Sequence, residues 1–183
     1  MKSCKAINKK TICALLSLII IALFLTCCGK NNRPKTDAIL CAMLSCAKEL
    51  KAGTVYTTAS SPGAPDYLSE GLLEALYGHG DFPDVLGRAE SISLRASSGL
   101  YAEEFAVFLC RSRRDTEEIA DLCLGRIDTI RYFINANSEK LSLDSDISAA
   151  LDNAKVIISG HYVIMVVSKD PSVAIAAAKE LIS

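Results

Sequence analysis

Few residues of this chain have the types and spacing that acid–base or metal chemistry needs. His79 stands between two glycines and near Asp81 and Asp84, and a histidine beside carboxylates is a candidate acid–base pair or weak metal site. The flanking glycines favour a solvated turn instead. His161 lies in a second expected turn, far in sequence from any base. Glu104 opens an apolar stretch, so its carboxylate matters if it is buried, although a position at an edge or rim is expected.

The motifs of common enzyme classes are absent from the sequence. It contains no Gly-x-Ser-x-Gly, His-Glu-x-x-His, P-loop or dinucleotide-binding fingerprint. There is no Cys-x-x-Cys, and the chain has two histidines, so neither a metal nor a cofactor is expected. Asp144 and Asp146 resemble the start of a calcium loop but lack its later ligands, and a helix cap is the better interpretation.

One basic cluster, Arg111, Arg113 and Arg114, stands out from the rest of the chain. Such a cluster can contact lipid phosphates or an acidic partner. A solvated loop that screens neighbouring acidic residues is the more ordinary interpretation. Together with His79 and Glu104, these arginines are the candidate binding residues.

The N-terminus has the three parts of an export signal. A basic start with four lysines precedes the uncharged run Ile12–Leu25, whose 14 residues fall short of the roughly 20 that span a bilayer as a helix. An uncleaved signal anchor is the alternative. Leu25-Thr26-Cys27-Cys28-Gly29 resembles the bacterial lipobox, in which a cysteine is diacylated and becomes the new N-terminus. Cys28 fits this pattern best, and Cys27 is the second choice.

This predicted signal gives the expected domain organisation of the chain and its expected location in the cell. We expect a signal peptide over 1–27, the lipidated Cys28 with a polar tether over 28–36, and one domain over 37–183, held at the extracytoplasmic face of the cell membrane by palmitate-type acyl chains. Four of the 20 basic residues and none of the 21 acidic residues lie in the signal, so the rest has a formal net charge of −5. Nucleic-acid binding, which relies on basic residues, is therefore not expected.

Hydrophobic periodicity predicts an α+β domain. Helices are expected over 37–50, 66–77, 116–135 and 171–182, and a breaker-rich loop over 52–65. Strands are expected over 91–96, 104–110, 155–159 and 162–167, the second and fourth of them apolar on both faces. Asp115 with Glu118 has the spacing of a capping box, and Asp170-Pro171 starts the last helix.

The order of these elements contains a repeat, because strand–strand–Asp–helix occurs twice. Two such ββα units can form a four-stranded, mainly antiparallel sheet of order 3-4-2-1, a circularly permuted ferredoxin-like arrangement. The two repeat helices would cover one face of this sheet, and the N-terminal helices part of the other.

Four cysteines remain in the predicted domain. Cys41 and Cys46 point in different directions on an expected helix, so a bond between them is not expected. Cys110 and Cys123 can meet where a strand leads into a helix, but two buried free thiols are the favoured interpretation.

Short motifs relate the chain to a known family. Glu104-Phe-Ala-Val-Phe108, Tyr77-Gly78, Arg126 and Gly160-His-Tyr-Val163 resemble landmarks of a family of small lipoproteins of Gram-positive anaerobes, which is catalogued as a domain of unknown function. The resemblance covers roughly 37–182. Asn135-Ala-Asn-Ser138 stands where the family has Tyr-x-Pro. The resemblance implies an exported lipoprotein and brings no activity or catalytic residue.

These observations favour a non-enzymatic binding module at the cell envelope. It would contact another envelope protein or a small ligand through a surface built on the sheet and the 52–65 loop. The alternatives are an envelope hydrolase using an Asp/Glu/His site, and a small solute-binding lipoprotein.

Overall fold

The computed structural model describes residues 33–78, 80–98, 101–137 and 145–183. Pro34–Ser183 form one compact unit of mixed helix and strand. Its elements, in chain order, are α2 (Thr36–Cys46), β1 (Gly53–Thr57), α3 (Glu70–Tyr77), the 3-10 helix η1 (Asp84–Arg88), β2 (Ala89–Ser97), β3 (Glu104–Cys110), α4 (Arg113–Ala136), α5 (Ser145–Asp152), β4 (Lys155–Ser159), β5 (Tyr162–Val167) and α6 (Pro171–Ile182).

The sheet has five antiparallel strands in the order β1-β2-β3-β5-β4. The predicted four-stranded, permuted ferredoxin-like sheet is therefore wrong in strand number. The four expected strands lie side by side in the order β4-β5-β3-β2, and β1 adds to the free edge of β2. Residues 53–57 carry two threonines, a valine and a tyrosine, which favour strand structure, and the breakers that suggested a loop over 52–65 begin after them.

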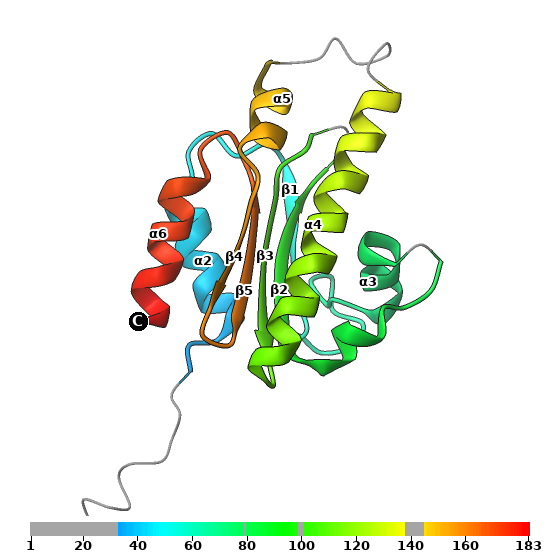
Figure 1. The fold of residues 1–183 in the computed structure, drawn as a ribbon, viewed down its shortest axis with the longest axis vertical. Coiled ribbons are helices and arrows are strands. Elements are labelled where there is room, and N and C mark those ends of the chain that lie inside the picture. The colour runs from blue at the N-terminus through cyan, green and yellow to red at the C-terminus, as the bar shows by residue number, and fades with distance from the viewer. Residues whose placement is uncertain (1–32, 79, 99–100, 138–144) are drawn as a thin grey trace, which may run out of the picture. The chain divides into compact units, whose positions relative to one another are not determined.

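Each face of the sheet carries its own hydrophobic core. Alternate residues of β3 point to opposite sides: Phe105, Val107 and Leu109 pack with α2 and α6, while Ala106, Phe108 and Cys110 pack with α3, α4 and α5. Figure 1 shows the two layers, with α2 and α6 on one side of the sheet and α3 and α4 on the other. The continuous apolar pattern of β3 follows from this double burial.

The expectation that both repeat helices share one face, with the N-terminal helices against the other, is wrong: α3 packs on the same face as α4, and α6 on the same face as α2. α4 connects the parallel strands β3 and β4, so the handedness of crossover connections constrains its side of the sheet. α6 ends its segment without leading into another strand, and no such rule fixes its side. Ala174, Ile175 and Ala178 of α6 bury their side chains beside α2, where they complete the second core.

The long helix α4 begins earlier than expected, and its cap has different members. Ser112 is the N-cap: its hydroxyl oxygen accepts a hydrogen bond from the Asp115 N–H, and the Asp115 carboxylate accepts one from the Ser112 N–H at 3.1 Å. Asp115 thus occupies the third helical position of the capping box instead of the cap. At α6 the predicted start is confirmed, since Asp170 accepts from the Ser172 N–H and Pro171 opens the helix.

None of the helices in the described segments is long and apolar enough to cross a bilayer. The predicted signal peptide, with Cys27, and residues 28–32 of the tether, with Cys28, lie outside the described residues.

Candidate functional site

Glu104 is the centre of a buried charged cluster. Its side chain is 3% exposed, and its Oε2 accepts from Arg126 Nη2 at 2.7 Å and from Arg126 Nε at 3.1 Å. The expected edge or rim position of Glu104 is therefore wrong, although it is the first residue of β3. Arg126 reaches it from the middle of α4, with a side chain that is 15% exposed. A forked guanidinium against a carboxylate is the strongest form of charge-assisted hydrogen bonding between side chains.

Tyr77, the last residue of α3, completes the cluster. Its hydroxyl donates to Glu104 Oε1 at 3.2 Å, and its ring meets Phe108 edge-on, with the ring centres 5.7 Å apart. Burial, reinforced by the negative charge of Glu104, raises the pKa of Tyr77 well above its ordinary value. The pKa of Cys123 is also raised. Burial is the main cause, and the negative charge of Glu104 adds to it.

The pKa values of Arg126 and Tyr77 are both raised in this cluster. Burial lowers the pKa of Arg126, but the attraction and hydrogen bonds of Glu104 outweigh it, so the net pKa of Arg126 is raised. Tyr77 stays protonated because its pKa is raised. The Glu104 carboxylate accepts hydrogen bonds from three groups, the Tyr77 hydroxyl and Arg126 Nε and Nη2. The cluster joins α3, β3 and α4 through side chains that hold one another in place.

A pocket of about 310 Å³ opens beside this cluster, between the β2–β3 end of the sheet and the second half of α4. Tyr101 and Phe133 are 44% and 52% exposed and form part of its wall. Five apolar and five polar residues make up the rest: Leu76, Ala96, Ala102, Ile130 and Ile134, and Ser97, Glu103, Glu104, Arg126 and Thr129. Arg126 donates to Glu104 through Nε and Nη2, and its Nη1 makes no hydrogen bond within the described part of the chain.

A second charged pair supports the same end of the sheet. Arg95 Nη1 lies 3.8 Å from Glu103 Oε2 and makes no hydrogen bond to the described part of the chain, while Arg95 Nη2 donates to the Lys51 carbonyl. The Lys51 N–H donates to Glu103 Oε2 at 2.9 Å, and its ammonium sits 5.6 Å from the centre of the Tyr101 ring. The connection from α2 to β1 is thereby tied to the wall of the pocket.

The structure separates the remaining predicted binding residues from this pocket. Arg111 lies between β3 and α4, and Arg113 and Arg114 are the first two residues of α4; all three are exposed, at the end of β3 opposite to Glu104. The length of β3 puts about 20 Å between the two places. His79 lies outside the described residues.

No described residue supports the metal alternative. Asp81 and Asp84 are exposed. His161 occupies the β4–β5 turn, where its Nδ1 is 3.2 Å from the Cys110 carbonyl oxygen, and Gly160 supplies the positive φ of 61° that the turn needs. Within the described segments no group of three histidine, cysteine or carboxylate side chains converges on a metal position. Cys110 and Cys123 are buried free thiols, and Cys41 and Cys46 are exposed free thiols.

Comparisons with known proteins give no relative: no family model, no curated protein and no solved structure matches the chain. The resemblance to the lipoprotein family therefore stays a prediction.

Sequence reasoning missed the aromatic wall and the partner of Glu104. Arg126 and Tyr77 entered only through the family resemblance, and Tyr101 and Phe133 not at all. The signal for Arg126 was present, since it lies one helical turn from Cys123 and Ile130 and so borders the buried stripe of α4. An arginine that borders a buried stripe needs a carboxylate partner, and Glu104 is the first residue of β3, on which α4 packs.

Proposed function

We propose that this protein is a non-enzymatic binding module, anchored by lipid at Cys28 to the extracytoplasmic face of the membrane, whose pocket receives an apolar group of another envelope protein. The observation that carries the proposal is the pocket itself, where half-exposed Tyr101 and Phe133 stand above the neutralised Glu104–Arg126 pair. Aromatic side chains that remain exposed around a concave apolar site are typical of binding surfaces.

The size and chemistry of the pocket support one inserted group. About 310 Å³ is at the lower limit of ligand pockets, which suits a single side chain better than a large ligand. The free Nη1 of Arg126 offers one hydrogen bond to an oxygen of the incoming segment. Because Glu104 is occupied by Arg126 and Tyr77, binding is favoured over the hydrolase alternative.

The sequence supports the location and the anchor. The basic start, the uncharged 14-residue run and the lipobox-like Leu25–Cys28 follow one another in the order of a lipoprotein signal. Membership of the lipoprotein family that the motifs resemble is part of the same proposal.

Filling the pocket tests the proposal. We expect Thr129→Phe, which places a ring in the pocket, to abolish cross-linked capture of a specific envelope protein by the tagged full-length chain in its native host. Ala136→Phe adds the same ring at an exposed position on α4 that does not line the pocket, and should leave capture unchanged. Equal capture by wild type and Thr129→Phe would contradict the role of the pocket.

A further inference from the structure

The two edges of the sheet differ in how far other segments pair with them. At the β1 edge, the Thr57 N–H donates to the Asp66 carbonyl at 2.9 Å and the Leu68 N–H donates to the Thr57 carbonyl at 3.1 Å. At the other edge, no described segment pairs with the outer side of β4. Figure 1 shows β4 in front of the other strands, between α6 and α4, with no helix across it. Of the two, β4 is therefore the open edge.

The hydrogen-bond pattern identifies which groups of β4 point outward. The Cys110 N–H donates to the His161 carbonyl, so the odd-numbered residues of β5 bond to β3 and the even-numbered ones bond to β4. Their partners in β4 are Lys155, Ile157 and Ser159. The N–H and C=O groups of Val156 and Ile158 therefore point away from the sheet, where they can bond to an added strand.

The two faces of β4 offer different surroundings to the side chains of such a strand. A groove of about 330 Å³ lies on one face, between β4 and α6. It is lined by Lys155, Ile157, Ser172, Ile175, Ala176 and Lys179. On the other face, which packs with α4, the Ile158 side chain is 47% exposed. One face is thus a groove with two cations, and the other is an apolar surface.

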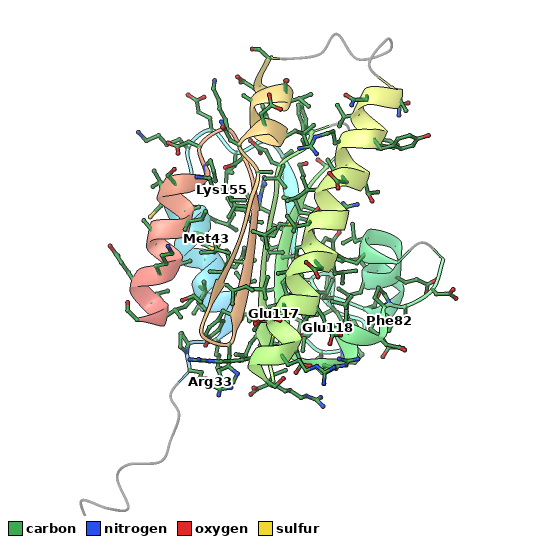
Figure 2. The ribbon with its side chains drawn as sticks, in the orientation of Figure 1. Arg33, Met43, Phe82, Glu117, Glu118 and Lys155 are labelled. Atoms are coloured by element: carbon green, nitrogen blue, oxygen red, sulfur yellow. The ribbon has the colours of Figure 1, made fainter. Side chains whose placement is uncertain are left out.

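The two lysines give the groove a positive charge. Lys155 and Lys179 are exposed, and neither makes an ion pair within the described part of the chain. Among the described residues, no acidic side chain lines the groove. Figure 2 shows Lys155 on the α6 side of β4. A carboxylate that enters the groove therefore gains two cationic partners.

We propose that β4 binds an extended segment of another protein as an added strand, and that this segment alternates apolar and acidic residues. Its main chain pairs with Val156 and Ile158, its acidic side chains enter the groove toward Lys155 and Lys179, and its apolar side chains pack on Ile158. The alternation follows from strand geometry, because successive side chains of a strand point to opposite faces.

The same charges argue against a second copy of the chain at this edge. Antiparallel pairing of two β4 strands would bring Lys155 and Lys179 of both copies together on one face of the joined sheet. Like charges across an interface are unfavourable, and lysine on an edge strand is a common protection against self-association. The lysines therefore favour an acidic partner and disfavour a second copy.

This surface is separate from the pocket of the proposed function. None of the residues that line the groove also lines the pocket beside Glu104. The inference therefore does not rest on the proposed function. Thr129→Phe, which fills the pocket, should leave binding at β4 unchanged.

An alternating peptide, Val-Glu-Val-Glu-Val-Glu-Val with blocked ends and a fluorophore, probes this surface on the full chain purified in detergent. We expect saturable binding by fluorescence anisotropy, and no binding of the peptide in which lysine replaces each glutamate. Lys155→Glu/Lys179→Glu should weaken binding by about tenfold, because two attractive pairs become repulsive. Lys48→Glu/Arg114→Glu changes the net charge equally at exposed positions outside the groove, and should bind as the wild type does.

Substitutions at Ile158 test the main-chain pairing. Ile158→Pro removes the outward N–H and leaves the hydrogen bonds between β4 and β5, so binding should be lost while the thermal unfolding transition remains. Ile158→Thr keeps the N–H and the branched side chain, and should still bind. If the proline unfolds the domain, the lysine variants still decide the question.

Several results would overturn the proposal. They are equal binding of the acidic and basic peptides, no saturable binding of either up to about 1 mM, equal loss in the two charge-reversed variants, and undiminished binding by a folded Ile158→Pro. A dimer in sedimentation equilibrium that Ile158→Pro dissociates would place a second copy on this edge, and would overturn it as well.

Discussion

At the scale of single residues, the Glu104–Arg126 pair combines two opposed effects. Taking both charges out of water is costly, and the bidentate geometry offsets that cost only while both partners are present. Removing one partner leaves a buried charge without compensation. Tyr77 adds one neutral donor and ties α3 to the same carboxylate.

Substitution of Arg126 should be strongly destabilising. We expect Arg126→Met to lower the free energy of unfolding by about 3–5 kcal/mol, because the Glu104 charge stays buried and unpaired. The double variant Glu104→Gln/Arg126→Met should recover at least half of this loss, since a glutamine oxygen still accepts from Tyr77 and carries no charge. Urea unfolding of both variants measures this, and equal losses would show that the pair is not coupled.

Three buried groups predict a loss of stability at high pH. Burial, with Asp115 as a second cause, raises the pKa of Cys110 from 9.0 to about 12, and burial raises the pKa of Tyr77 and Cys123 as well. The unfolded chain releases these protons at lower pH than the folded one. Stability is therefore intact below about pH 8 and falls as the pH rises from about 9 toward 12, by up to about 1.4 kcal/mol per group and pH unit.

Urea midpoints at pH 8 and pH 10.5 measure this fall, and Cys110→Ala should reduce it. Thiol labelling gives an independent reading at pH 8: Cys41 and Cys46 should react in the folded domain, and Cys110 and Cys123 only after unfolding. A third thiol that reacts at the rate of the first two would contradict the burial of Cys110 and Cys123.

At the scale of elements, the strands that face two cores could be predicted, and the edge strand β1 could not. Residues 104–110 and 162–167 are apolar on both faces, a pattern with few alternatives in so short a run. Most residues of Gly53–Thr57 are exposed, so the sequence of this strand shows no alternation of apolar and polar residues. The strand forms because it pairs with β2. The side of α6 was also beyond the sequence, because packing with α2 decides it.

The cap of α4 gives a prediction at this scale. Ser112→Ala removes the hydroxyl that accepts from the Asp115 N–H, and we expect it to cost about 1 kcal/mol of unfolding free energy. The Ser112 hydrogen bonds are the main cause of the lowered pKa of Asp115, so this variant should also raise that pKa. Ser45→Ala, on the exposed side of α2, is the matched control and should cost less than 0.5 kcal/mol. Equal losses in thermal unfolding would contradict the capping box.

At the scale of the whole domain, the candidate site was only partly predictable. Glu104 was recognised as a candidate, and the structure adds the buried pair and pocket that give it a role. The sequence grouped Glu104 with the arginines, because it cannot show that β3 holds them at opposite ends. This separation gives the domain two distinct surfaces, the exposed Arg111, Arg113 and Arg114 at one end of β3 and an aromatic-walled pocket at the other.

Site-resolved photo-cross-linking in the native host tests the central claim most directly. A photoreactive amino acid in place of Phe133 lies on the pocket wall, and the same amino acid in place of Leu181 is comparably exposed on α6, on the opposite face of the sheet. We predict one repeated cross-linked product with an envelope protein from position 133 and none from position 181. The same product from both positions, or none from position 133, would contradict a binding module that uses this pocket.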